Sequence, residues 1–260
     1  MTDTPAQMTG DQRVCAIMQP TFLPWLGYFS LIAQADDFVF LDDVQFTKQS
    51  WQNRNRISGP NGPVLLSLPV ARKPSFPLIN EARFGQPDFE RKLVARIKGC
   101  LGKAPHWPLV ERLLETGLAR SSHGLSAVNI GFIRDICSEI GIDATFHQTS
   151  RMNLPDFERS ERLLRICERL KAGIYLSPVG SAGYLRDSNP FSEQGVRLRF
   201  MSFAHPQYAQ ARHAFQSHMS IIDALAWTGP DETRRMIIEG IGTPLGIEAL
   251  DLPGDDDPRP

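Results

Sequence analysis

Short apolar runs alternate with amphipathic helices along this chain, and this alternation constrains its fold more than any other feature. The runs 13–18 (RVCAIM) and 37–42 (DFVFLD) are almost continuously apolar, as in strands of a parallel sheet that are buried on both faces. A helix predicted over 25–35 separates them. The pattern resumes with predicted strands at 143–147, 174–178 and 196–201 and predicted helices at 157–171 and 217–229. The chain therefore predicts an α/β fold, with a mainly parallel sheet and helices on both faces.

Two features interrupt this alternation. The segments RNRIS and VLLSLPV flank GPNG, which predicts an antiparallel hairpin of 54–58 and 64–70. Three consecutive helices are predicted at about 87–100, 106–119 and 124–140, so that residues 87–141 form a helical insertion. We expect a single α/β domain over 13–245, a disordered N-terminus over 1–12 and a loose C-terminal tail over 246–260, because both ends have little to bury.

Charge and apolar content exclude several classes of protein. The 260 residues carry 28 Lys and Arg against 29 Asp and Glu, and a net charge of −1 argues against a dedicated nucleic-acid-binding protein. No apolar run approaches the ~18 residues of a membrane span, and the start lacks the apolar segment of a signal peptide, so we expect a cytoplasmic protein. Neither the four cysteines nor the histidines have the spacing of a zinc site, so no metal site is predicted.

Loops that follow predicted strands hold the candidate site, because ligands of open α/β sheets bind beyond the carboxyl ends of the strands. The loop 19–29 (QPTFLPWLGYF) contributes Gln19, Gly27 and Tyr28. Its glycine either admits an anionic ligand to a helix N-terminus or allows close packing. The loop 175–185 (YLSPVGSAGYL) can present hydroxyls and N–H groups to an anion, or it is a plain flexible turn. Its candidates are Ser177, Gly180, Ser181, Gly183 and Tyr184.

A third loop, 41–56 (LDDVQFTKQSWQNRNR), joins two adjacent carboxylates to an aromatic and basic segment. Asp42 and Asp43 can act as a base, orient an amine or bind a metal. In extended backbone they point opposite ways, so we expect Asp42 to pair with the hairpin arginines. The rest of the loop suits phosphate or carboxylate, although a polar hairpin with Asp–Arg pairs is the alternative. The binding candidates here are Gln45, Trp51, Asn53, Arg54, Asn55 and Arg56.

Three further candidates lie outside these loops. Asn129 falls on the apolar side of its predicted helix, where its amide must be hydrogen-bonded. It either anchors a neighbouring loop or contacts the ligand. His205 and Tyr208, in the segment FAHPQY, follow the predicted strand 196–201 and complete the set of binding candidates.

Several motifs resemble those of the WbqC-like family of bacterial proteins: QPTFLPWLGYF, LDDVQF followed by WQNRNRI, VNIGFI, IYLSPVGSAGYL and FAHPQY. The resemblance runs in order from about Val14 to Gly229, and its first two motifs are highly specific. It implies a role in gene clusters for O-antigen or other surface polysaccharides. Lys48-Gln49 stands where members often carry more basic residues, and Ser177-Pro178-Val179-Gly180 departs from the commoner Ser-Gly-Pro-x-Gly.

A more distant similarity concerns the segment 24–28 (PWLGY), which occupies the place of the HxGH motif of nucleotidylyltransferase-like proteins. In that motif the histidines contact nucleotide phosphates. Both histidines are missing here, and neither proline nor tyrosine is a cation at neutral pH. The substitution disfavours adenylylation by this chain.

The residues and this context leave three functions open. The first, which we favour, is a transferase that forms an amide on an amino sugar or similar amine, from a carrier-protein or coenzyme A thioester or a nucleotide-linked donor. Asp42 or Asp43 would then deprotonate the amine, with Tyr28 as a third catalytic candidate, 51–56 would hold the donor phosphate, and 177–184 would stabilise the oxyanion. An acyl carrier protein would be the partner of such an enzyme.

The other two functions differ in their chemistry. The second is an ATP-using nucleotidylyltransferase or adenylate-forming ligase, which would bind Mg²⁺ at Asp42 and Asp43. The third is a non-catalytic subunit that binds a sugar nucleotide or a carrier. ATP dependence separates the second function from the first, and ligand binding without turnover identifies the third.

Overall fold

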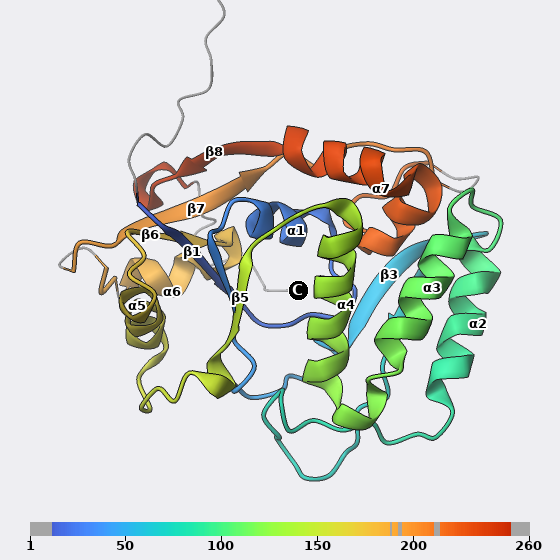
Figure 1. The fold of residues 1–260 in the computed structure, drawn as a ribbon, viewed down its shortest axis with the longest axis horizontal. Helices are drawn as coiled ribbons and strands as arrows, with labels where there is room; N and C mark the ends of the chain where they lie inside the picture. Colours follow the sequence, from blue (N-terminus) through green and yellow to red (C-terminus); the bar gives the residue numbers. More distant parts are fainter. Residues whose placement is uncertain (1–11, 188, 192–193, 211–213, 251–260) are drawn as a thin grey trace, which may run out of the picture.

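The computed structural model describes residues 12–187, 189–191, 194–210 and 214–250. Of the predicted disordered N-terminus, all but Gln12 lies outside the described residues, and the predicted C-terminal tail is described only over 246–250. Within this range the predicted α/β class is confirmed. A six-stranded sheet carries helices on both faces, and a two-stranded hairpin is separate from it (Figure 1).

The large sheet has the strand order β5-β2-β1-β6-β7-β8. Its strands are β1 (Val14–Met18), β2 (Asp37–Phe40), β5 (Thr145–Gln148), β6 (Ile174–Ser177), β7 (Arg197–Phe203) and β8 (Ile241–Leu245). The first five are mutually parallel, as expected from their apolar runs, and β8 is antiparallel to β7. The sequence did not predict β8, because Gly242 and Pro244 are uncommon inside strands; as an edge strand, β8 tolerates the proline.

Helices cover the sheet from two sides because alternate residues of each strand face opposite ways. In β1, Val14 and Ala16 belong to a core that includes residues of α1, α4 and α7, whereas Cys15 and Ile17 belong to a second core with residues of α5 and α6. The helices are α1 (Leu26–Ala33), α2 (Phe89–Leu101), α3 (Trp107–Leu118), α4 (Leu125–Ile140), α5 (Arg159–Arg169), α6 (Ala182–Asp187) and α7 (Ile221–Glu239). Short 3₁₀ turns are η1 (Ser121–His123), η2 (Thr149–Arg151), η3 (Val179–Ser181) and η4 (Ile247–Ala249).

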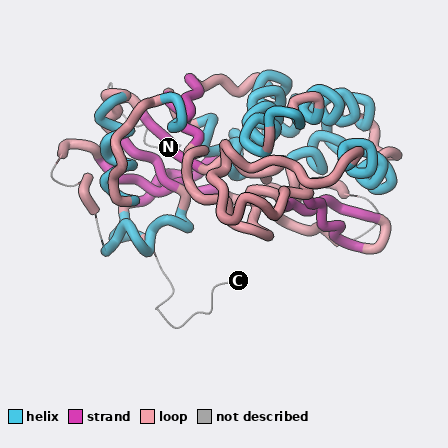
Figure 2. Tube along the Cα trace, turned by 90° about the horizontal axis from the view of Figure 1, so that it is seen from below, coloured by secondary structure: helices cyan, strands magenta, loops and turns pink. Residues whose placement is uncertain are grey.

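The predicted helical insertion is confirmed as α2, α3 and α4, which pack on one another. The predicted hairpin is also confirmed, as β3 (Arg54–Gly59) and β4 (Gly62–Ser67), and it packs on α2. The hairpin lies at the end of the molecule opposite the large sheet (Figure 2). The last helix, predicted over 217–229, is longer in the structure, where α7 continues to Glu239. The chain kinks at Gly229 (φ 80°), and the second half of the helix begins with Pro230.

The strand order determines where a ligand can enter. Strand β1 lies between β2 and β6. The connection that follows β1 leads to β2 on one side of it, and the later strands β6 and β7 are added on its other side. Such a switch opens a crevice beyond the carboxyl ends of the strands. The loops after β1, β2 and β6, which hold most of the candidate residues, meet there.

Candidate functional site

A cavity of about 870 Å³, here called the main cavity, lies at the carboxyl ends of β1, β2 and β6. Its walls include Met18 at the end of β1 and Leu41 just after β2. All three predicted loops contribute to it, although they lie far apart in the sequence. The predicted binding residues that line the main cavity are Gln19, Gln45, Trp51, Gly180, Ser181 and Tyr184.

The charge of the main cavity is one-sided. Among the residues that the structure describes, the charged side chains lining it are Arg159 and Arg162, both from α5, and no acid lines it. The guanidinium of Arg159 lies 4.4 Å from the ring centroid of Tyr184. Burial raises the pKa of Tyr184, an effect that Arg159 partly offsets, so the phenol is a neutral hydrogen-bond donor at physiological pH. Two arginines in a lining that contains no acid suit a phosphate or carboxylate group, although Arg162 also pairs with Asp43 outside the lining.

Aromatic rings form much of the remaining wall. Trp51 is 54% exposed, and the guanidinium of Arg56 lies 5.6 Å from its ring centroid. An exposed indole flanked by a cation offers a face on which a planar ring can stack. The other aromatic residues of the main cavity are Trp25, Phe157, Tyr175, Tyr184 and Phe203.

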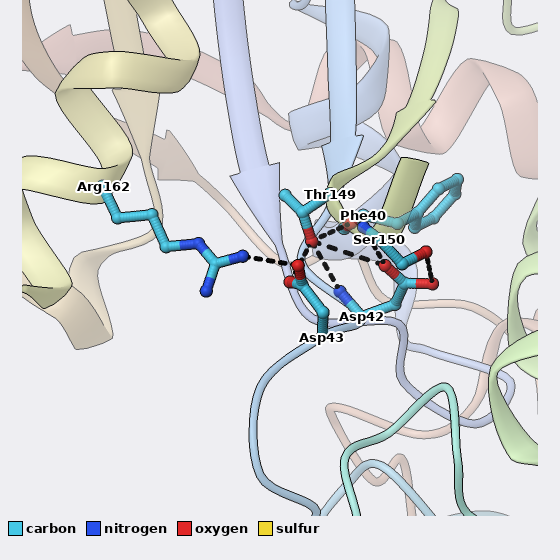
Figure 3. Close-up of polar contacts among 6 residues, drawn as sticks. All are labelled: Phe40, Asp42, Asp43, Thr149, Ser150 and Arg162. Carbon is cyan, nitrogen blue, oxygen red and sulfur yellow. Dashed lines mark hydrogen bonds and ion pairs between the residues drawn. The ribbon is translucent and has the colours of Figure 1, made fainter. Parts of the chain in front are cut away.

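The two adjacent carboxylates point to different sides, as their spacing predicted (Figure 3). Asp43 accepts hydrogen bonds from Thr149 Oγ1 at 2.5 Å and from Arg162 at 2.6 Å, and its side chain is 21% exposed. Asp43 does not itself line the main cavity, but its ion pair places it directly behind Arg162. The Asp43 carboxylate therefore lies between α5 and η2, next to the cavity lining but outside it.

Asp42 is an anchor within the protein rather than a partner of the hairpin. It is buried and accepts hydrogen bonds from the Ser150 N–H (3.0 Å), the Ser150 hydroxyl (2.9 Å) and Ser126 Oγ (3.2 Å). The expectation that Asp42 pairs with Arg54 or Arg56 is wrong. The donors come from Ser150, which follows β5, and from Ser126 on α4, tertiary contacts that spacing alone does not reveal.

Asn129 holds two loops of the site together. It is fully buried on α4, and its Nδ2 donates to the carbonyls of Pro20 (3.0 Å) and Gln52 (2.8 Å). The Gln52 side chain in turn donates to Gln19 Oε1 at 2.8 Å and so orients a residue of the main cavity. Of the two roles considered for Asn129, the structure shows the loop anchor.

The asparagines at the hairpin anchor neighbouring backbone, whereas its arginines are half-buried. Asn55 is buried and donates to the carbonyls of Phe22 (3.0 Å) and Leu23 (2.6 Å), and buried Asn53 donates to the carbonyl of Leu68 at 3.0 Å. Asn55 thus fixes the 19–25 loop against the hairpin, and Asn53 ties the two ends of the hairpin together. Arg54, at the start of β3, is outside the set of described residues that line the main cavity.

Tyr28 and Gly27 lie behind the main cavity. Tyr28 is buried, its hydroxyl donates to the carbonyl of Gln19 at 3.0 Å, and burial raises its pKa. With Asn55 it lines an adjoining cavity of about 200 Å³. A Cβ on Gly27 would overlap the indole of Trp25, so this glycine makes room for an aromatic side chain of its own helix N-terminus.

The loop after β6 holds a pair of hydrogen-bonded hydroxyls and two open glycines, of which Ser181 and Gly180 line the main cavity and Ser177 and Gly183 do not. Buried Ser177 shares a hydrogen bond with Ser181 Oγ at 2.5 Å, and Ser181 Oγ also donates to the carbonyl of Pro178 at 2.6 Å. A Cβ on Gly180 or Gly183 would meet no atom within 4 Å among the described residues. The backbone at these glycines is therefore accessible.

His205 lies next to the main cavity, because it contacts the lining residue Trp25, whereas Tyr208 does not. The His205 ring stacks on Trp25 with centroids 5.8 Å apart, and its Nε2 accepts the His218 N–H at 3.0 Å. Burial lowers the pKa of His205, which keeps the ring neutral in this arrangement. Tyr208 donates its hydroxyl to Asp223 at 3.2 Å, away from the cavity lining.

The residues that sequence reasoning missed are on α5. This helix was predicted, but its arginines were not distinguished from ordinary surface charges. A signal was present: Arg159 and Arg162 precede the buried Leu163 and Ile166 by four residues and so share their side of the helix. Arg165, by contrast, precedes another arginine at that spacing.

The described residues contain neither a metal-binding cluster nor a membrane-spanning helix. No group of three or more His, Cys, Asp or Glu side chains is arranged to hold a metal ion in that part of the chain. None of the helices described combines the length and apolar character needed to cross a membrane.

The fold and the site define an α/β protein with a basic, aromatic-lined cavity at the carboxyl edge of a mainly parallel sheet. The model of the WbqC-like protein family matches residues 19–235, and the chain belongs to this family. It is also 30% identical over 219 residues to the uncharacterized protein Rv1507c of Mycobacterium tuberculosis, an alignment that covers 83% of this chain and 94% of that protein. No solved structure matches the chain.

Proposed function

We propose that the chain is a transferase that binds a phosphate-bearing activated donor in the main cavity and forms an amide on an amine acceptor. The observation that carries this proposal is the charge of the main cavity: Arg159 and Arg162 line it, and no acid does so within the described residues. Its volume of about 870 Å³ is within the usual range for small-molecule and cofactor sites. The context of surface-polysaccharide genes, implied by the resemblance, supplies amino sugars as a class of acceptor.

The donor is held by its phosphate and by its planar ring. A guanidinium has five N–H donors, so Arg162 retains free donors after its single contact with Asp43. Arg159 contributes a second guanidinium three residues away on the same helix. The exposed face of Trp51 stacks the base of a coenzyme A or nucleotide-linked donor.

The acceptor amine binds next to Asp43. After its bonds to Thr149 and Arg162, each Asp43 carboxylate oxygen retains a lone pair for an amine N–H. The amine nitrogen attacks the acyl carbon, the new C–N bond forms, and the bond to sulfur of the thioester breaks. The proton lost by nitrogen passes to Asp43 and then to the leaving thiolate. The accessible backbone at Gly180 stabilises the oxyanion.

Calorimetric titration with coenzyme A and with UDP tests donor binding. Arg159→Ala should weaken binding of the donor probe by at least tenfold, the usual loss for a charge-assisted hydrogen bond. Arg169→Ala is the matched control, because this arginine is exposed on the same helix and does not line the main cavity. A wild-type protein that binds neither probe, or a control that weakens binding as much as Arg159→Ala, would contradict the proposal.

Turnover distinguishes a transferase from the alternatives. Release of free thiol from acetyl-coenzyme A is measured with a panel of amino sugars, with and without ATP and Mg²⁺. We expect ATP-independent release that Asp43→Asn lowers far more than it lowers donor affinity. Release only with ATP would favour the nucleotidylyltransferase or ligase, and tight binding without turnover would favour a binding subunit.

A further inference from the structure

A second cavity lies on the other side of the wall formed by Asp42, Thr149 and Asp43. It has a volume of about 780 Å³ and lies between α4 on one side and the end of β5 with η2 on the other. Asp42 lines this second cavity. The residues that precede and follow the Asp42-Asp43 pair in the sequence, Leu41 and Val44, line the main cavity instead. Among the described residues, the two cavities have no lining residue in common.

The second cavity carries an excess of positive charge. Three arginines line it, and only Arg120 has a carboxylate partner among the described residues, Asp135 at 2.7 Å. Arg134 projects from α4 with its guanidinium 5.7 Å from the ring centroid of Phe146, and exposed Arg151 ends η2. The Asp42 carboxylate is already occupied by hydrogen bonds from neighbouring hydroxyl, amide and backbone groups. The lining therefore has three arginines against two carboxylates, and the guanidinium groups of Arg134 and Arg151 have no carboxylate partner among the described residues.

The backbone of α4 is adapted to this arrangement. A Cβ on Gly131 would lie 2.6 Å from Cδ of Arg120, so the glycine lets the Arg120 side chain cross the helix. Gly131 belongs to the segment 128–133 (VNIGFI), whose Asn129 anchors the main cavity from the opposite side of the same helix. An adjoining cavity of about 230 Å³ shares Arg134 and Arg151 and extends the space along β5.

We propose that the second cavity binds a small phosphate ester through Arg134 and Arg151, separately from the donor in the main cavity. The two guanidinium groups come from different elements, α4 and η2, and so approach a ligand from two sides. A tetrahedral phosphate has oxygens for both of them, whereas a planar carboxylate is satisfied by one arginine. Hydroxyl groups of Ser126, Ser138 and Ser150 line the same space and suit the polar body of such a molecule.

Titration with glucose 6-phosphate, followed by calorimetry at physiological salt, tests this site. The Arg134→Ala/Arg151→Ala double variant should bind this probe at least tenfold more weakly than the wild type. The control is Arg91→Ala/Arg96→Ala, which removes two exposed arginines of α2 that line neither cavity and so changes the net charge equally. Circular dichroism should show unchanged thermal midpoints for both double variants, because all four side chains are exposed.

The outcomes separate this site from the main cavity. Arg159→Ala should leave binding of glucose 6-phosphate unchanged, even if the proposed transferase activity proves to be absent. A wild-type protein that does not bind the probe, or an Arg134→Ala/Arg151→Ala variant that binds it normally, overturns the proposal. Equal weakening by the α2 control shows attraction by net charge alone and also overturns it. Succinate binding as tightly as glucose 6-phosphate would refute the assignment to phosphate esters.

Discussion

Replacing Asn129 tests the idea that one buried amide holds the main cavity in shape. In Asn129→Ala the carbonyls of Pro20 and Gln52 lose donors that now lie 3.0 and 2.8 Å away, in a part of α4 that is fully buried. A buried polar group left without its partner costs about 1–3 kcal/mol. Two such groups, partly relieved by loop movement, should lower the free energy of unfolding by about 3 kcal/mol.

Urea unfolding at 25 °C measures this loss, and two further variants isolate its cause. Asn129→Leu keeps a similar volume without a donor, so it should lose nearly as much stability as Asn129→Ala if the hydrogen bonds are decisive. Ser138→Ala, at an exposed position of the same helix, should stay within about 0.5 kcal/mol of the wild type. A loss below about 0.5 kcal/mol in Asn129→Ala would refute the role of the amide as the anchor of both loops.

Three further predictions concern close packing and buried titratable groups. Gly27→Ala should displace the Trp25 indole and lower the free energy of unfolding by about 1–3 kcal/mol. Tryptophan fluorescence and urea unfolding measure these two effects, and unchanged values would contradict the packing described. Burial raises the pKa of Asp223, so folding favours its protonated form and its contribution to stability is lost as pH rises through the folded pKa. Asp223→Asn should therefore be at least as stable as the wild type at pH 7, and Asp223→Ala clearly less stable; the reverse order would refute this. Burial lowers the pKa of His205, so the folded state favours the neutral ring. Protonation of Nε2 would remove the acceptor of the His218 N–H, so the free energy of unfolding should fall as pH drops from the ordinary histidine range through the lowered pKa. Thermal unfolding between pH 7 and 5 should show a smaller decline for His205→Asn, and an equal decline would exclude this origin.

The sequence was sufficient for most of the sheet because each parallel strand is a short apolar run. The residues of β1, β2 and β6 are buried on both faces, and such runs have few other structures open to them. It was insufficient for β8 and for the second half of α7. There the signals conflict: a proline interrupts each segment, and only the edge position of β8 and the kink at Gly229 accommodate it.

For the site, the sequence indicated which loops would meet but not what each side chain would do. The rule that ligands bind beyond the carboxyl ends of strands brought Gln19, Trp51 and Ser181 to one cavity. The partners of Asp42 could not be predicted, because they come from residues more than 80 positions away. Arg162 was missed for a similar reason, since its ion pair with Asp43 joins two segments that only the tertiary fold brings together.

The position of a bound donor tests the central claim most directly. A crystal structure of the protein with coenzyme A would show whether the main cavity holds a phosphate-bearing molecule. We predict that phosphate oxygens lie within hydrogen-bond distance, about 2.7–3.2 Å, of the guanidinium groups of Arg159 or Arg162 and that the adenine ring stacks on Trp51. Coenzyme A bound elsewhere, with the main cavity empty, would contradict the account.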